Sequence, residues 1–223
     1  MFGRKLPAAV LWDMDGTLVD SEEYWLSSEQ SLANEFNGSW GEQDGLDLIG
    51  MSLYDSSMVM KAKMGLELEP EEIINRLTDD VVARLEVSIP WRPGAQELLR
   101  ELKKRGVKTA LVTMSMTRMA ESVANQIPFK AFDVIVAGDM VTHGKPHPEP
   151  YLMAARLLGV APADCVALED SLTGLTSAEA AGTKAVGVTN IVPIPEQPGR
   201  IIWPTLEGVT LRDLRKLFSK RNP

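Results

Sequence analysis

Five short apolar runs, separated by helical patterns, constrain the fold of this chain more than any other feature. Polar or glycine-containing turns bound the runs, which lie at 8–12, 108–112, 133–137, 165–168 and 184–188. Segments with the apolar spacing of helices begin near residues 92, 117, 148 and 171. Strands and helices that alternate in this way predict βαβ units, in which helices cover both faces of a parallel sheet. We therefore expect an α/β fold.

Residues 18–91 interrupt this alternation, because they show helical periodicity without a convincing strand. Three amphipathic segments begin near residues 22, 53 and 70. We predict a helical insertion here, so that the main domain comprises 1–17 and 92–223. The proline-rich tail after residue 191 predicts mostly extended loop before a last helix around 210–221.

The composition argues against several partners. The net charge of -8 opposes binding to the phosphate backbone of nucleic acid. We find no run of about 18 apolar residues that would span a bilayer, and the N-terminal segment has too short an apolar stretch for a signal peptide. We therefore expect a cytoplasmic protein with no membrane partner.

Cys165 is the single cysteine and lies in an apolar run, which favours a buried structural thiol.

The segment DMDGTLVDS at 13–21 carries the most informative chemistry. Residues two apart on an extended strand project to the same side, so Asp13 and Asp15 would present their carboxylates together. Two such charges repel each other unless a cation or a shared proton compensates them. Gly16 permits a sharp turn directly afterwards, and Thr17 can cap it. By itself, the segment is also compatible with a solvated turn after a strand.

Three other predicted strand ends carry groups that complement these carboxylates. Thr113 and Ser115 follow one strand and offer hydroxyls that can hold phosphate oxygens. Lys145 lies in a proline-containing loop, and Glu169 and Asp170 follow another strand. Each group has an ordinary explanation on its own, as a helix cap or a solvated charge. Because ligands bind at the carboxyl edge of an open parallel sheet, we expect these groups to converge.

The chain resembles the haloacid dehalogenase-like superfamily in four motifs, which occur in the expected order: DMDGTLVDSE, VTMS, GKPHPEPY and EDSLTGLTSAEAAG. It is similar to the phosphatases and mutases of this superfamily that carry a small helical cap, of the phosphoglycolate phosphatase and β-phosphoglucomutase kind. The resemblance covers nearly the whole chain. It implies a Rossmann-like parallel sheet core with an inserted α-helical cap at 18–91. It also implies a magnesium-dependent phosphatase that acts on a small-molecule phosphate ester, such as a sugar phosphate or phosphoglycolate.

The resemblance further implies a role for each catalytic residue. Asp13 would attack phosphorus and form an acyl phosphate, which splits hydrolysis into two easier displacements. Asp15 would protonate the leaving alkoxide and later activate water. Thr113 would bind the transferred phosphoryl group, and Lys145 would neutralise its charge.

Magnesium is the implied cofactor, and it prefers hard oxygen ligands. Its ligands would be Asp13, Asp170 and the backbone carbonyl of Asp15, with Glu169 close behind. Met114 stands where a small or polar residue is expected, so it is a candidate for substrate selection, with a packing role as the alternative. The implied phosphate-binding residues are Gly16, Thr113, Met114 and Lys145.

Three other functions use the same scaffold. A β-phosphoglucomutase-like phosphotransferase would share the core, but such mutases typically carry a histidine at the cap hinge, near which this chain has Trp25. A haloalkanoate dehalogenase needs neither the metal nor a second carboxylate, so Asp15 and Asp170 argue against it. A catalytically silent binding protein would be expected to lack one of the key residues, and all are present.

Several further residues have both a structural and a functional explanation. His143 and His147 are four apart, but the prolines around them prevent a shared helix face, which favours a loop-shaping role over a metal site. Three tryptophans are candidates to line the cleft between cap and core, or to pack structurally: Trp25, Trp40 and Trp91. We expect a monomer or weak homodimer. The identity of the substrate does not follow from these patterns.

Overall fold

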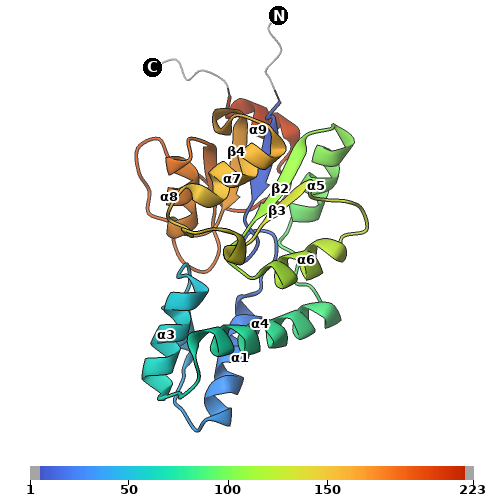
Figure 1. Cartoon of the computed structure of the whole chain (residues 1–223). Coiled ribbons are helices and arrows are strands. Elements are labelled where there is room, and N and C mark those ends of the chain that lie inside the picture. The colour runs from blue at the N-terminus through green and yellow to red at the C-terminus, as the bar shows by residue number, and fades with distance from the viewer. Residues whose placement is uncertain (1–5, 219–223) are drawn as a thin grey trace, which may run out of the picture.

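The computed structural model describes residues 6–218, which form a sheet lobe and a smaller helical lobe (Figure 1). Six strands in this part of the chain build the sheet, all parallel and in the order β3-β2-β1-β4-β5-β6. The strands are β1 (Ala9–Trp12), β2 (Lys108–Val112), β3 (Val134–Val136), β4 (Cys165–Glu169), β5 (Lys184–Val188) and β6 (Ile201–Trp203). All five predicted apolar runs are strands. The strand order reverses at β1, which pairs with β2 on one side and β4 on the other, so a ligand site is expected at its carboxyl end.

Each face of the sheet has its own apolar core, because side chains alternate along a strand. On β1, Val10 and Trp12 belong to one core, and Ala9 and Leu11 belong to the other. Cys165 is buried in the second core, as predicted. The first core contains α5 (Ala95–Lys104), α6 (Thr117–Asn125) and α9 (Leu211–Lys216), and the second contains α7 (Glu149–Leu158) and α8 (Leu172–Ala180). Burial on both sides explains why these strands read as continuous apolar runs.

The helical lobe comes from the segment that interrupts the strand–helix alternation. Its helices are α1 (Glu22–Glu35), α2 (Glu42–Leu46), α3 (Leu53–Met64) and α4 (Pro70–Val87). A separate core that includes Leu32, Met60 and Leu77 holds α1, α3 and α4 together. The second half of α4 also contributes Val81 and Leu85 to the core of the sheet lobe. This helix therefore fastens the two lobes to each other.

The structure adds elements that the sequence did not indicate. The tail, predicted as extended loop, contains the edge strand β6, which pairs with β5 through Ile201 opposite Val186. Three residues are too few to show a period in the sequence. Short helices not predicted are α2, η1 (Gly138–Met140) and η2 (Pro162–Asp164). The predicted last helix corresponds to α9, and its expected end at 219–221 lies outside the described residues. Within residues 6–218, every helix is too short or too polar to cross a membrane.

Candidate active site

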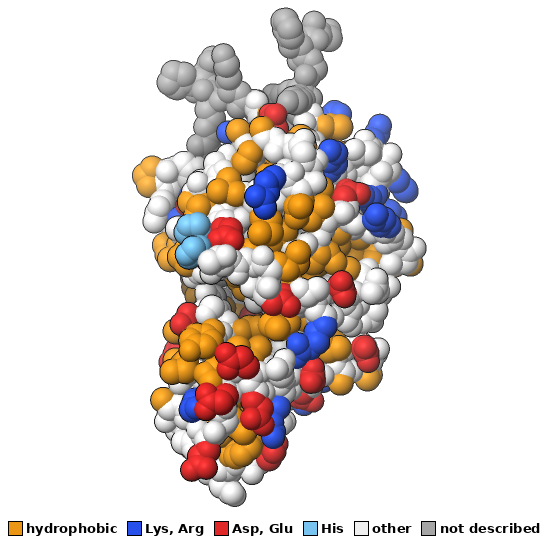
Figure 2. All heavy atoms as spheres, in the orientation of Figure 1, with side chains coloured by type: hydrophobic (Ala, Val, Ile, Leu, Met, Phe, Trp, Pro, Cys, Tyr) orange, Lys and Arg blue, Asp and Glu red, His pale blue; other side chains and the backbone are white. Residues whose placement is uncertain are grey.

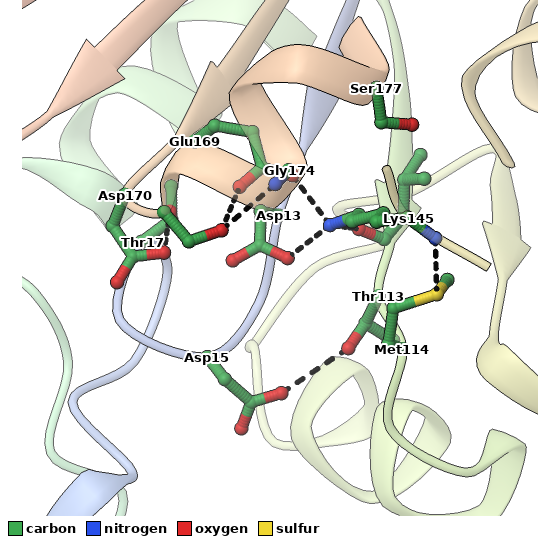
Figure 3. A network of polar contacts seen from close by, with 12 residues as sticks. Asp13, Asp15, Thr17, Thr113, Met114, Lys145, Glu169, Asp170, Gly174 and Ser177 are labelled. Atoms are coloured by element: carbon green, nitrogen blue, oxygen red, sulfur yellow. Dashed lines mark hydrogen bonds and ion pairs between the residues drawn. The ribbon is translucent and has the colours of Figure 1, made fainter. Parts of the chain in front are cut away.

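The carboxyl ends of the central strands bring the predicted charged residues together (Figure 3). Asp13 directly follows β1, Glu169 ends β4, and Lys145 comes from the loop before α7. The Lys145 side chain is only 5% exposed, and its Nζ donates to Asp13 Oδ1 at 2.6 Å. The same ammonium lies 2.6 Å from Glu169 Oε1 and donates to the Val112 carbonyl at 2.9 Å. Lys145 is therefore fixed between two buried carboxylates.

Glu169 directly contacts the lysine, and its predicted place close behind a metal stays a prediction. It has no exposed surface, and the hydroxyl of Tyr151 donates to the same Oε1 atom. A Cβ atom on Gly174 would lie 2.0 Å from Glu169 Oε2, so only glycine lets α8 pack this closely. Sequence reasoning missed Tyr151, because its position in a helical pattern does not distinguish it from an ordinary core aromatic.

Asp15 accepts hydrogen bonds from both lobes. Thr113 Oγ1 and Ser115 Oγ donate to its Oδ2 atom at 3.2 and 2.7 Å. Ser21 Oγ and Trp25 Nε1 donate to its Oδ1 atom at 2.5 and 3.2 Å. The two hydroxyls expected to hold phosphate oxygens thus point at Asp15 here, and phosphate binding by Thr113 stays a prediction. Because Trp25 belongs to α1, its indole links the helical lobe directly to Asp15.

Gly16 shapes the site through its backbone conformation, and Met114 shapes it through its sulfur atom. Gly16 has φ +81°, and a Cβ atom there would lie 1.9 Å from Asp170 Oδ2. Its N–H donates to the Val19 carbonyl at 2.7 Å, so its part in phosphate binding stays a prediction. Met114 Sδ accepts the backbone N–H of Lys145 at 3.2 Å (Figure 3). Its side chain therefore supports the lysine loop, which favours the packing role.

The buried carboxylates of the site fit a divalent cation. Asp13, Glu169 and Asp170 offer oxygens that all lie within 4.8 Å of one another. Three carboxylates beside the single Lys145 ammonium leave an excess of negative charge. Hard oxygen donors with this excess charge match the preferences of such an ion.

The pKa values of the site express the same excess of negative charge. Burial, together with the charge of Glu169, raises the pKa of Asp13 to about 8. Burial, together with Asp13 and Glu169, raises the pKa of Asp170 well above its usual range. Burial would lower the pKa of Lys145, but the attraction of Asp13 and Glu169 outweighs it and the net shift is upward. Without a cation, the site therefore favours protonated carboxyl groups.

A cleft of about 930 Å³, partly open to solvent, joins these groups to the helical lobe. Figure 2 shows a hollow at the waist between the lobes, bordered by apolar side chains. Of the three candidate tryptophans, Trp25 lines the cleft. Trp40 is buried in the core of the helical lobe, and Trp91 packs against the core of the sheet lobe.

The two histidines of the chain are exposed, and Figure 2 shows them side by side on the sheet lobe in pale blue. His143 Nδ1 lies 3.0 Å from Glu149 Oε2. The Glu149 carboxylate also accepts the backbone N–H groups of Thr142 at 2.9 Å and His143 at 3.0 Å. His143, His147 and Glu149 have potential ligand atoms within 4.8 Å. Their mutual hydrogen bonds hold the loop before α7, in keeping with a loop-shaping role.

Glu29 on α1 is a buried carboxylate in the cleft that the sequence did not single out. It is 6% exposed, and Trp40 Nε1 donates to its Oε2 atom at 2.9 Å. Burial raises its pKa from 4.5 to about 7, against the opposing effect of the Trp40 hydrogen bond. The residue pattern of α1 did not indicate this burial, because glutamates in amphipathic helices usually face solvent.

We expect Glu29→Gln to change how stability depends on pH. Between pH 4.5 and about 7 the folded protein holds a proton on Glu29 that the unfolded chain loses, so the free energy of unfolding falls as pH rises. At pH 8 the variant should exceed the original protein by on the order of 2 to 3 kcal/mol, and this gain should shrink below pH 4.5. Urea unfolding at pH 4, 6 and 8 measures it, with the exposed Glu23→Gln as control. A gain that does not vary with pH would contradict the assignment.

Comparisons with known proteins agree with this geometry. Residues 7–182 match the family model of haloacid dehalogenase-like hydrolases. Hexitol phosphatase B of Escherichia coli K12 is 29% identical over 223 residues, with 95% of each chain covered. A variant of CbbY from Rhodobacter sphaeroides, in complex with xylulose-(1,5)bisphosphate, has a TM-score of 0.83 at 27% identity, covering 94% of this chain and 99% of that one. β-Phosphoglucomutase from Clostridium difficile shares the fold, with a TM-score of 0.80 at 24% identity over 95% and 96% of the two chains.

The family match spans well over half of the chain, and the site residues stand in the order that the four motifs predict. The chain therefore belongs to the haloacid dehalogenase-like hydrolases, and the phosphatases among its relatives support its assignment as a phosphoric monoester hydrolase.

Proposed function

We propose that the protein is a magnesium-dependent phosphatase that releases phosphate from a small phosphorylated metabolite, such as a sugar phosphate or phosphoglycolate. One observation carries this proposal: buried Asp13 lies 2.6 Å from the Lys145 ammonium, at the strand end from which Asp15 also projects. The relative named hexitol phosphatase B supports a sugar or sugar-alcohol phosphate as substrate.

In the first step, an oxygen of Asp13 attacks phosphorus, and the bond from phosphorus to the leaving oxygen breaks. Lys145 stays beside Asp13 and balances charge on the phosphoryl oxygens, with Thr113 as a further phosphoryl contact. Asp15 gives its proton to the leaving alkoxide, and an alcohol departs. Asp13 is then an acyl phosphate.

In the second step, Asp15 accepts a proton from a water molecule, and the water oxygen attacks phosphorus. The bond from phosphorus to the Asp13 oxygen breaks, which releases inorganic phosphate and restores the carboxylate. Ser115 and Ser21 orient Asp15 for both transfers through their hydrogen bonds. A magnesium ion held by Asp13, Asp170 and the Asp15 carbonyl, with Glu169 behind them, would offset the negative charge of carboxylates and phosphate.

Residues 18–91 act as a cap in this proposal, with hinges near 18–21 and 88–93. Isolated backbone pairing of Val19 with Asp15 and Trp91 brings the two connections together, which supports a shared hinge. Closure would exclude bulk water and select small substrates. We further propose that the protein acts in the cytoplasm as a monomer or weak homodimer, without nucleic acid or membrane partners. The net charge of -8 supports the exclusion of nucleic acid.

Activity is expected to require a divalent cation, because Asp13 and Asp170 otherwise repel a phosphate dianion. Exhaustive chelation should abolish phosphate release, and magnesium should restore it. Calcium should restore it poorly, since it takes more ligands at longer distances. A colorimetric phosphate assay on p-nitrophenyl phosphate measures all three. Undiminished turnover after chelation would refute the metal assignment.

A screen of phosphorylated metabolites with magnesium tests the proposed function, with Asp13→Asn as the blank. It should include β-glucose 1-phosphate with a bisphosphate activator, which separates the phosphatase from the mutase alternative. We expect phosphate release to exceed glucose 6-phosphate formation. Trp25 Nε1 donates a hydrogen bond to Asp15 Oδ1 near the cap hinge, where such mutases use a histidine. Isomer formation much faster than phosphate release would favour the mutase.

A further inference from the structure

The part of the cleft that lies in the helical lobe combines apolar side chains with two carboxylates. The carboxylates are Glu22 and Glu29, both on α1. The apolar lining from this lobe comprises Leu48, Ile49, Met51, Leu53, Met60, Ile74 and Leu77, next to Trp25. An organic group attached to a phosphate at Asp13 would therefore lie on apolar surface and beside two acidic groups.

Positive charge is scarce in the same space. Lys145 is the one basic side chain among the described residues that line the cleft, and it is already engaged by Asp13 and Glu169 at 2.6 Å each. The N-terminus of α3 borders the cleft, but Asp55 in its first turn offsets the positive end of that helix. A second phosphate group in the helical lobe would lose its water without a compensating cation, and above the pKa values of Glu29 (about 7) and Glu22 (about 8) it would also meet like charges.

Glu29 is positioned to accept hydrogen bonds from a ligand. Trp40 Nε1 holds its Oε2 atom at 2.9 Å, and a Cβ atom on Gly45 would lie 2.8 Å from that oxygen, so α2 covers this side. The Oε1 atom has no hydrogen-bond partner within residues 6–218, although the residue is only 6% exposed and lines the cleft. Burial, together with the charges of Asp15 and Glu29, raises the pKa of Glu22 to about 8. The acceptors therefore continue from the reaction centre into the helical lobe.

We infer that Glu22 and Glu29 form a leaving-group subsite that takes an uncharged, polyhydroxylated group and excludes a second phosphate. This inference rests on the proposed phosphatase function. Hydroxyl groups of the leaving alcohol donate to the two carboxylates, and its C–H surfaces pack on the apolar wall. A buried acceptor of this kind favours substrates with a hydroxyl group, because a substrate without one leaves the acceptor unpaired at a cost in free energy. The same subsite disfavours bisphosphates, because their second phosphate would lie beside Glu22 and Glu29 without a basic side chain.

The assays of this subsite use the magnesium-loaded protein at pH 9, where Glu22 and Glu29, with pKa values of about 8 and about 7, are ionised. Paired substrates test the charge rule. The pairs are glucose 6-phosphate with glucose 1,6-bisphosphate, fructose 6-phosphate with fructose 1,6-bisphosphate, and ribulose 5-phosphate with ribulose 1,5-bisphosphate. We expect kcat/KM for phosphate release to be at least about 10-fold higher for the monophosphate of the preferred pair. Equal or faster release from its bisphosphate would overturn the inference. Met51→Lys places a cation on the apolar wall at a side chain that is 44% exposed, and should raise kcat/KM for the bisphosphate by about 10-fold.

Glu29→Gln tests whether the Glu29 carboxylate accepts a hydrogen bond from the substrate. The readout is a ratio of two kcat/KM values, which a general loss of activity leaves unchanged. The kcat/KM ratio of the preferred monophosphate to p-nitrophenyl phosphate, which lacks hydroxyl groups, should fall by about 10-fold. Glu23→Gln, on the same helix and outside the cleft lining, should leave this ratio unchanged. An unchanged ratio in Glu29→Gln, or no gain of bisphosphate turnover in Met51→Lys, would overturn the inference. If p-nitrophenyl phosphate is hydrolysed while kcat/KM is equal for the two members of each sugar pair, only the subsite inference is wrong. If no ester releases phosphate, the phosphatase proposal is wrong as well.

Discussion

Replacement of Asp13 by Asn is expected to lower phosphate release by at least about 1,000-fold, because the amide has nearly the same shape but is a poor nucleophile. The assay is phosphate release from the best substrate of the screen, with magnesium present. Labelling with a radioactive phosphate ester should also give no phosphorylated protein, whereas the original protein should carry label on Asp13. Near-normal rates in Asp13→Asn, with label still on the protein, would mean that another residue is the nucleophile.

The same variant is expected to stay folded. Asp13 is 6% exposed and its pKa is raised to about 8, so the buried negative charge is unfavourable to the fold near neutral pH. The uncharged amide removes this cost, and Lys145 keeps Glu169 as its partner at 2.6 Å. The melting temperature without divalent cations should therefore be unchanged or higher. The stabilisation that magnesium gives the original protein should be lost, because Asp13 is a proposed ligand.

Lys145→Met is expected to damage both catalysis and stability. It removes the ammonium that Asp13 and Glu169 share, and Glu169 has no exposed surface through which water could compensate. Removal of one partner from a buried ion pair typically costs about 3 to 5 kcal/mol. Urea unfolding at pH 7.5 without divalent cations measures the loss, with the exposed Lys104→Met as the matched control. Catalysis should fall as well, since no other basic side chain of the described cleft lining can balance the phosphoryl charge.

The stability deficit of Lys145→Met should also depend on pH. Protonated carboxyl groups need no cation, and the pKa of Asp13 is about 8 even with the lysine present. The part of the deficit that comes from Asp13 should therefore be small near pH 4 and should grow as pH rises through about 8, because the original protein then ionises Asp13 beside the ammonium and the variant does so only at higher pH. A variant as stable as the original protein at pH 7.5 would show that Lys145 does not hold the buried carboxylates in place.

Much of the fold could be predicted from local patterns. Strands buried on both faces read as continuous apolar runs, and helices buried on one face show periodic apolar spacing, so each pattern directly reflects its surroundings. β6 escaped prediction because Ile201–Trp203 is a short, half-buried edge strand whose pairing with β5 has no local signal. The order of the strands, with β1 at the reversal, depends on which runs pair across more than 90 residues.

The charged residues of the site could also be predicted from local patterns, whereas their hydrogen-bond partners could not. The sequence predicted Asp13, Asp15, Glu169 and Asp170 at strand ends, because they follow apolar runs, and it predicted Lys145 in a proline-containing loop. Their partners could not be identified, since a hydrogen bond between distant residues depends on how whole elements pack. Tertiary structure alone directs the hydroxyls of Thr113 and Ser115 towards Asp15, and the Trp25 indole from the helical lobe to the same carboxylate.

Electrostatic surroundings were likewise decided only by tertiary structure. Glu29 is one of many acidic residues in the sequence, and its burial beneath Trp40 follows from the packing of α1, α3 and α4 around one core. The sequence by itself determined which chemical groups the chain carries to the edge of the sheet, because that depends on local order along each strand. Only the folded structure decided which of these groups water can reach and which charges they face, because burial and distance arise when separate elements pack together.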